Sequence, residues 1–360
     1  REIAFEIDSM GGNVDAFTAH ELSGYYAQAL DERLPEAFSL LADLTTSPCF
    51  DPEELDRERG VILEEIAGAE DDPEDVLFEA FQSNFWKGHA LARPILGTRE
   101  TVRGFGREDL SGWMNDIGAA DMVVSAAGNL DHDAVADLVA ERLGDLPAGT
   151  PRPERVAPSI TPHVQTIKRD MEQVQLYVAG PGPSLADDDR FAAYLLNTLL
   201  GGGVSSRLFQ TIREERGLVY NVYSSVASYS DTGYVWIGAA TRPQSADVVL
   251  DLIEVELRRL CDEPLQPEEL TRTKDQVKAG LMLSLEQTFG RMANLAREEI
   301  GFGRTFSLDE ILESIDSVNV EDIRRCAQRL FGGPLSAGCV GSGDAVEALQ
   351  KTLDEHPRFG

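Results

Sequence analysis

The sequence predicts an α+β protein of two duplicated domains, each a mainly antiparallel sheet backed by helices. Its 360 residues exceed the usual size of one domain. Two pairs of matching segments, about 213 and 215 residues apart, indicate an internal repeat. Glu100–Leu110 matches Glu313–Ile323, and Asp51–Leu55 matches Gln266–Leu270. Five prolines without periodicity between the copies predict a linker over 147–163, and hence domains at 1–146 and 164–360.

The composition excludes several classes of function. The net charge of −31 argues against binding to nucleic acid or to anionic membrane surfaces. It suits cationic peptide substrates, although an acidic surface is also a common property of whole proteomes. No apolar run approaches the roughly 18 residues of a membrane span. No C-x-x-C pair occurs, which predicts free thiols in a reducing compartment and a cytoplasmic location; the four cysteines are Cys49, Cys261, Cys326 and Cys339.

Alternating and helical hydrophobic spacing predicts the elements of the first half in order. A Gly-Gly-Asn turn follows the first helix. The expected elements are a helix over 1–10, strands over 14–18 and 23–30, a helix over 34–46, a helix that begins at Asp51 within the stretch Phe50–Asp75, helices over 76–85 and 108–117, a buried strand over 122–127, and a helix over 131–143.

The helix that begins at Asp51 carries the first candidate site. Asp51 is a good N-cap and Pro52 suits the first helical position. Glu58 and Glu65 are seven residues apart, so about two helical turns place both carboxylates on one face. On spacing alone, a solvated acidic face is the more common interpretation of such a pair.

The segment Arg57–Ile66, RERGVILEEI, resembles the second metal-site helix of the pitrilysin/insulinase family of zinc peptidases. The similarity is greatest to the small two-domain members, which include mitochondrial processing peptidase. The resemblance implies that zinc is the cofactor, that Glu65 is a zinc ligand and that Glu58 supports it from one heptad earlier. Glu64 lies about 100° round the helix and is the poorer candidate.

One part of the family pattern is absent from these residues. The family takes two His ligands and a general base from an H-x-x-E-H helix, and the sequence contains no such motif. The family spacing, counted back from Glu65, places the motif before Arg1, and the repeat gives a similar distance of about fifty residues. We therefore expect a truncated first domain and an incomplete zinc site, since no two of the histidines are close in sequence: His20, His89, His132, His163 and His356.

The first strand is a candidate substrate-binding element. In the family, the strand after such a Gly-Gly turn binds the substrate backbone by strand addition. Without the resemblance, this segment would be an ordinary hairpin. The family usually has Asn where Asp15 stands, and we expect His89, in the loop after the next helices, to be structural. The matching residues are Gly12, Asn13, Asp15, Ala16, Phe17 and Thr18.

The second copy carries different chemistry. Glu58 and Glu65 align with Thr273 and Gly280, so this copy lacks the metal carboxylates. The resemblance instead identifies Arg213 and Tyr220 as the pair that holds the substrate and the tetrahedral intermediate. It also implies that Gly201, Gly202 and Gly203 form a glycine-rich substrate-binding loop, although a helix C-cap or a flexible turn explains such a triplet equally well.

The resemblance covers essentially the whole chain and implies a zinc endopeptidase that cleaves extended peptides inside a clamshell chamber. Its partners would be peptide substrates and a second subunit, in a homodimer or in a heterodimer with a related chain. The alternative is a non-catalytic structural or partner subunit of such a peptidase. A scaffold without any active site ranks last, because it would require every matching segment to be coincidental.

Overall fold

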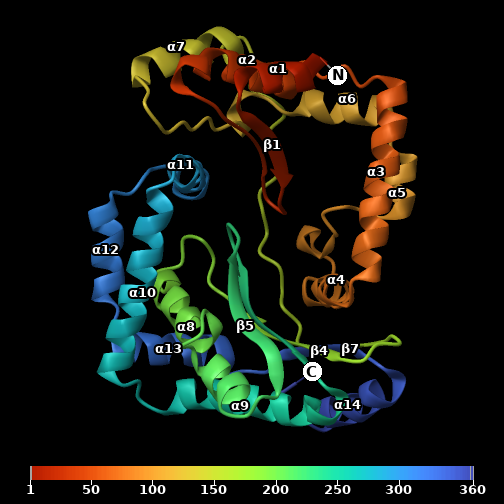
Figure 1. Ribbon diagram of the computed structural model, residues 1–360, viewed down its shortest axis with the longest axis vertical. Helices are drawn as coiled ribbons and strands as arrows, with labels where there is room; N and C mark the ends of the chain where they lie inside the picture. The colour runs from red at the N-terminus through yellow and green to blue at the C-terminus, as the bar shows by residue number, and fades with distance from the viewer. Residues whose placement is uncertain (1, 357, 360) are drawn as a thin grey trace. The chain divides into compact units, whose positions relative to one another are not determined.

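The computed structural model describes residues 2–356 and 358–359 of the chain, and it is a mixture of helices and two β-sheets (Figure 1). The predicted α+β class is confirmed. The chain divides into two compact units, each built from separate stretches of sequence. Unit 1 contains the residues up to Ala67 together with Ile95–Glu154 and Met282–Thr305, and unit 2 contains Gly68–Pro94, Arg155–Leu281 and the residues from Phe306 onward.

Unit 1 is mostly helical and contains a two-stranded antiparallel sheet, β1 with β2. Its small buried cluster consists of Met10, Ala37 and Leu40. Large apolar side chains such as Phe17 and Tyr25 on the hairpin are exposed. The elements are α1 (Glu2–Met10), β1 (Asn13–Thr18), β2 (Ser23–Gln28), η1 (Asp31–Arg33), α2 (Leu34–Thr46), most of α3 (Pro52–Asp71), α5 (Arg99–Gly104), α6 (Arg107–Asp116), η3 (Ala119–Asp121), α7 (His132–Leu143) and α11 (Thr288–Phe302).

Helix α3 begins where its capping residues predict. The Asp51 carboxylate accepts hydrogen bonds from the backbone N–H groups of Glu53 and Glu54, at 2.9 and 3.3 Å, which confirms Asp51 as the N-cap. Of the apolar side chains of α3, Ile66 is buried, whereas Val61 is exposed. The helix therefore buries only part of the face that its sequence offers.

The buried strand predicted over 122–127 is wrong, because the structure shows no strand there and Val123 and Val124 are exposed. A strand needs a neighbouring strand to accept its backbone hydrogen bonds. The corresponding segment of the second copy, Ser336–Gly341, forms β7 between two strands and is entirely buried. The described residues of unit 1 offer 122–127 no such partner, so the same hydrophobic pattern remains irregular.

Unit 2 is built on a five-stranded sheet in the order β3-β7-β4-β6-β5. Only β3 and β7 are parallel, and the other neighbours are antiparallel. Its elements are α4 (Pro73–Phe85), η2 (Ala90–Ala92), β3 (Val164–Lys168), β4 (Val174–Pro181), α8 (Arg190–Gly201), η4 (Phe209–Glu214, a π-helix), β5 (Val219–Ser228), β6 (Gly233–Thr241), η5 (Pro243–Ser245), α9 (Ala246–Asp262), most of α10 (Pro267–Leu285), α12 (Leu308–Ser317), α13 (Val320–Phe331), β7 (Ser336–Gly341) and α14 (Gly343–Glu355).

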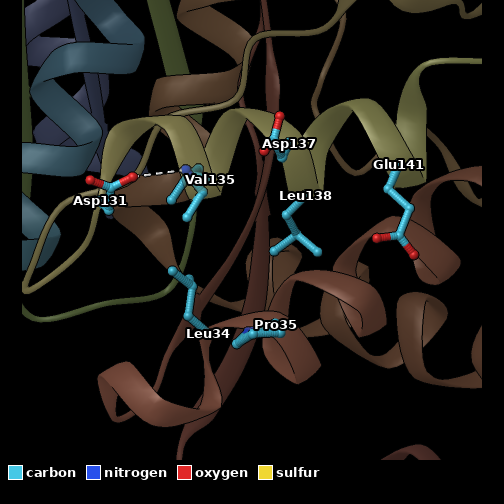
Figure 2. Close-up of a pocket in the computed structure, with 8 residues that line it drawn as sticks. Leu34, Pro35, Asp131, Val135, Asp137, Leu138 and Glu141 are labelled. Atoms are coloured by element: carbon cyan, nitrogen blue, oxygen red, sulfur yellow. Dashed lines mark hydrogen bonds between the residues drawn. The ribbon is translucent and has the colours of Figure 1, made fainter.

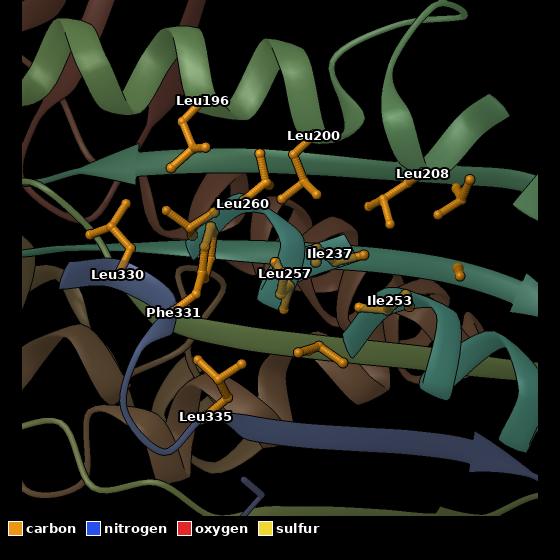
Figure 3. Packing of buried hydrophobic residues seen from close by; sticks show 14 of the residues in the cluster. Leu196, Leu200, Leu208, Ile237, Ile253, Leu257, Leu260, Leu330, Phe331 and Leu335 are labelled. Atoms are coloured by element: carbon orange, nitrogen blue, oxygen red, sulfur yellow. The ribbon is translucent and has the colours of Figure 1, made fainter. Parts of the chain in front are cut away.

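Alternating side chains of this sheet face two separate cores. On one face, Val235 and Ile237 of β6 pack with residues of α8, α9, α13 and α14 in the large cluster of Figure 3. On the other face, Tyr234 of β6 and Tyr177 of β4 pack with Phe81 and Trp86 of the α4 segment. Alternate side chains along the central strands are therefore buried on both faces of the sheet, which is why β4 and β6 contain few polar residues.

The helices of the two copies correspond as the repeat predicts. Helix α3 begins at Pro52 and α10 at Pro267, while α6 begins at Arg107 and α13 at Val320. The segment 147–163 contains no helix or strand. Its assignment as an inter-domain linker stays a prediction.

Candidate functional site

The guanidinium of Arg213 lies between two aromatic rings. Its Cζ is 4.6 Å from the ring centroid of Phe209 and 5.3 Å from that of Tyr220. Such stacking holds the planar group while leaving its N–H donors in the plane available. With the residues that the structure describes, the Arg213 side chain makes no hydrogen bond and no ion pair. It is therefore an oriented, half-buried cation with unused donors.

Tyr220 stands on a β-bulge. The pairing of β5 with β6 shifts between Val219, opposite Thr241, and Val222, opposite Ala239, so β5 has one extra residue there. A bulge interrupts the ladder and re-aims the side chains at it. The Tyr220 side chain is 81% exposed although its neighbour Val219 is buried. The bulge thus presents the Tyr220 phenol to solvent while its ring still contacts Arg213.

The glycine triplet has a structural explanation in addition to the expected binding role. Gly201 is not part of a loop, as the sequence predicted, but is the buried last residue of α8, and Gly202 is the C-cap of that helix. A Cβ at Gly201 would lie 2.4 Å from the backbone nitrogen of Ser224. Glycine is therefore required where α8 passes β5, whereas Gly203 faces only the side chain of Gln276, at 3.0 Å.

Glu58 and Glu65 both lie on α3 with exposed side chains, as their spacing predicts. Neither carboxylate forms a hydrogen bond or an ion pair with any residue in the described part of the chain. The same holds for Glu64. Two accessible carboxylates at this spacing can ligate or support a cation, but a catalytic zinc needs about three protein ligands.

The described residues do not complete a zinc site. Across residues 2–356 and 358–359, no group of three or more His, Cys, Asp or Glu side chains could hold a metal ion. His89 accepts a hydrogen bond from the backbone of Leu91 at 3.2 Å and so caps a short helix, as expected of a structural residue. His356 pairs with Glu254 at 2.9 Å, and His163 lies 4.7 Å from the ring of Phe81 in unit 2. Within the described ranges, the two carboxylates of α3 therefore stand without the further ligands that a catalytic zinc needs.

Strand β1 has one paired edge, to β2, and no strand of the described chain pairs with its other edge. An unpaired edge is able to accept an extended peptide. Asp15 is held by Tyr26 opposite it, whose hydroxyl donates to Oδ2 at 3.1 Å, and this hydrogen bond raises the pKa of Tyr26. A Cβ at Gly12 would lie 2.3 Å from the carbonyl oxygen of Gln28, so this turn requires glycine. Asn13, Ala16, Phe17 and Thr18 occupy the remaining strand positions.

Unit 1 contains a pocket of 410 Å³ between the start of α2 and helix α7 (Figure 2). Leu34 and Pro35 line it from the start of α2, and Leu138 faces them from α7, which also contributes Asp137 and Glu141 and the N-cap residue Asp131. Asp131 already accepts a hydrogen bond from the Ala134 N–H as the N-cap of α7. None of the residues predicted from the sequence to bind metal or substrate lines this pocket.

The sequence reasoning missed two features of the Arg213 region. Phe209, four residues before Arg213, is its stacking partner on the same helical segment, and an i, i+4 aromatic–cationic pair could have indicated it. The bulge at Tyr220 has no sequence signal, because it depends on the register with β6.

Comparison with known proteins identifies the family of this chain. Residues 1–99 match the family described as insulinase (peptidase family M16), and residues 105–277 match the peptidase M16 inactive domain. The chain belongs to the M16, or pitrilysin/insulinase, peptidase family. It is 37% identical over 349 residues to an uncharacterized zinc protease of Streptomyces coelicolor, covering 94% of this chain and 76% of the relative. A Bacillus subtilis relative with the same description is 36% identical over 332 residues, covering 92% of this chain and 81% of the relative.

Two solved structures share the fold. A peptidase M16 inactive domain from Pseudomonas fluorescens superposes with a TM-score of 0.85 at 18% identity, covering 94% of this chain and 83% of that chain. A protease from Helicobacter pylori gives 0.83 at 17% identity, covering 94% and 84%. Among the helices that the structure describes, none combines the length and the hydrophobicity needed to cross a bilayer.

Proposed function

We propose that this chain acts as a zinc-dependent endopeptidase on extended peptides or unfolded segments, with Glu65 as one zinc ligand and Glu58 as its support. Membership of the M16 family and the zinc protease descriptions of its relatives favour this function. The two exposed carboxylates on one face of α3 are compatible with it.

The observation that carries the proposal is the stacked Arg213 side chain, whose N–H donors no described residue uses. In a chain of net charge −31, a half-buried guanidinium would be expected to pair with a carboxylate. Arg213 is instead stacked between Phe209 and Tyr220 with its donors unused by the described residues. Oriented donors of this kind suit a peptide carbonyl, and they interact more strongly with the negative charge that develops on its oxygen during hydrolysis. The Tyr220 hydroxyl is the second donor in this proposal.

The remaining zinc ligands belong to the proposal as well. The described residues supply one ligand, so the two histidines and the general base would come from an H-x-x-E-H segment that these 360 residues do not contain. In the same proposal, the free edge of β1, from Gly12 to Thr18, binds the substrate backbone by strand addition.

Peptide binding by the 360-residue chain tests the role of Arg213. The titration follows the fluorescence anisotropy of an unstructured, labelled peptide at 0.15 M salt, where long-range attraction is screened. Arg213→Gln should weaken binding by about tenfold or more, since it removes charge-assisted hydrogen bonds. The matched control is Arg216→Gln, because Arg216 already pairs with Glu215 and the Thr211 carbonyl. Equal affinities of all three proteins would refute the assigned role.

Hydrolysis tests the zinc proposal. The 360-residue chain should hold no stoichiometric zinc and show no chelator-sensitive cleavage, whereas the chain extended at its N-terminus by an H-x-x-E-H segment should show both. Tyr220→Phe in the extended chain should lower kcat/KM and leave the zinc content unchanged. Tight zinc binding and activity in the 360-residue chain would contradict the proposal.

A folded but inert extended chain would instead favour the alternative function, a non-catalytic partner subunit. We also propose that the protein is cytoplasmic, on the evidence of its free cysteines, and that it associates with a second copy or a related subunit. Sedimentation velocity of the purified chain tests the association, and a monomer at all concentrations would exclude the homodimer.

A further inference from the structure

A bidentate ion pair joins the start of the helical segment 207–214, which follows the glycine triplet, to helix α10. Arg207 Nε donates to Glu269 Oε1 at 2.9 Å, and its Nη2 donates to Oε2 at 2.8 Å. The two side chains are only 21% and 20% exposed. Two parallel charge-assisted hydrogen bonds fix direction as well as distance, so this pair restrains the orientation of whatever backbone carries Arg207.

That backbone is the helical segment 207–214, which also carries Arg213. Leu208 and Ile212 are fully buried in the core of unit 2, and Leu208 is seen there in Figure 3. The Gln210 amide donates to the Val204 carbonyl at 2.7 Å, which ties the segment to the preceding turn. The buried side chains of Leu208 and Ile212 attach the segment to the core, but apolar contacts do not fix its orientation because they are non-directional. The ion pair at Arg207 supplies the directional restraint.

Charge and geometry can be separated at Arg207. Burial opposes its charge, but the hydrogen bonds to Glu269 and the charges of Glu269, Glu256 and Glu263 together raise the pKa of Arg207. A lysine at this position would keep the attraction to these three carboxylates. It would lose the planar fork, because an ammonium group acts as a point charge. Arg207→Lys therefore tests the geometry of the pair with little change in its charge.

We propose that Arg207 and Glu269 are positioning residues that, through the segment 207–214, set the orientation of Arg213 between Phe209 and Tyr220. The inference rests on the proposed peptide-binding role of Arg213 and assigns the pair no contact with the peptide. It gives a role to a largely shielded bidentate pair that lies six residues before the unused guanidinium.

The first test observes Arg213 directly, without any peptide. Ring currents from Phe209 and Tyr220 should shift the Nε–H resonance of Arg213 in a ¹⁵N-labelled protein, and Arg213→Gln assigns that resonance by removing it. Arg207→Lys should move or broaden it. The control is Arg324→Lys, since Arg324 makes an equally bidentate pair with Glu321 on the exposed side of α13. Glu269→Gln, which leaves one hydrogen bond from the charged guanidinium to a neutral amide oxygen, is the second variant should Arg207→Lys not fold. An unchanged resonance in a folded variant of the pair overturns the proposal.

The second test is the affinity for the labelled, unstructured peptide used for Arg213. Arg207→Lys should weaken binding by about 3-fold to 10-fold, since it misplaces one charged donor group without removing it. Arg324→Lys should leave the affinity unchanged. Unaltered binding by Arg207→Lys contradicts the positioning role. If the wild-type chain binds no peptide, the proposed function of Arg213 fails, while the resonance of Arg213 still decides whether the pair positions it.

Discussion

Gly201→Ala should destabilise unit 2 because there is no room for a methyl group where α8 crosses β5. The new Cβ would lie 2.4 Å from the Ser224 backbone nitrogen and 2.9 Å from the Ser224 Cβ. Overpacking against backbone costs about 1–3 kcal/mol. The higher helix propensity of alanine relative to glycine offsets at most about 1 kcal/mol of this cost at a helix end. Displacement of Ser224 would also weaken its hydrogen bond to the Asn197 carbonyl, now 3.1 Å long, so we expect a net loss of about 1–3 kcal/mol.

The assay is urea unfolding followed by tryptophan fluorescence. Trp86 and Trp236 lie in unit 2, and a Trp113→Phe background removes the one tryptophan of unit 1. The control is Gly203→Ala, whose Cβ would meet only the flexible end of Gln276 at 3.0 Å, and which should change the free energy of unfolding by less than about 0.5 kcal/mol. Equal stability of the two variants would refute the steric argument. A loss of peptide binding confined to Gly203→Ala would support the expected substrate role of the triplet.

Three further predictions concern unit 2 and the cysteines. Phe81→Ala should lower the free energy of unfolding in urea by about 3–5 kcal/mol, because Phe81 is fully buried. The control, Phe105→Ala at an exposed position, should lower it by less than about 0.5 kcal/mol. Similar losses of stability in the two variants would contradict the packing of α4. Burial lowers the pKa of His163, so the unfolded chain binds the proton more readily and stability should fall as the pH drops below about 6.5. His163→Gln should reduce that fall between pH 7.5 and 5.5, and an identical fall would show that His163 is not its source. Only Cys49 is exposed, and burial raises the pKa of Cys326 and Cys339 to about 12, so a thiol reagent should label one cysteine rapidly in the folded protein and four in urea.

Local signals in the sequence predicted the α-helices described in the first half of the chain, except α5. Asp51 before Pro52 defines the start of α3, and hydrophobic spacing alone gives α2 with its observed bounds. The internal repeat then placed α10 and α13 by correspondence with the first half. These features depend on neighbours within a few residues, which a sequence records directly. The positions of Glu58 and Glu65 on one exposed face follow from the same periodicity.

Features that depend on distant partners could not be predicted. The apolar segment 122–127 has the composition of a strand, but a strand exists only where its neighbours do. The exposure of Tyr220 depends on a register shift against β6, and the ion pair of Arg207 joins residues 62 positions apart. The requirement for glycine at 201 arises from Ser224 on another element. In each case the contact that decides the structure joins residues that are far apart in the sequence.

The composition of the two units has a consequence for biosynthesis. Unit 2 uses residues 68–94 from the early part of the chain, and unit 1 includes residues 282–305 from the late part. As the chain leaves the ribosome, α4 is synthesised more than seventy residues before the strands of unit 2. Unit 1 is complete only after α11 has been synthesised. If one half folds before the other, the usual order for multidomain chains, α4 and α11 are the elements left without the unit to which they belong. After a nick between the halves, α4 should therefore pack against the sheet only once both fragments are mixed.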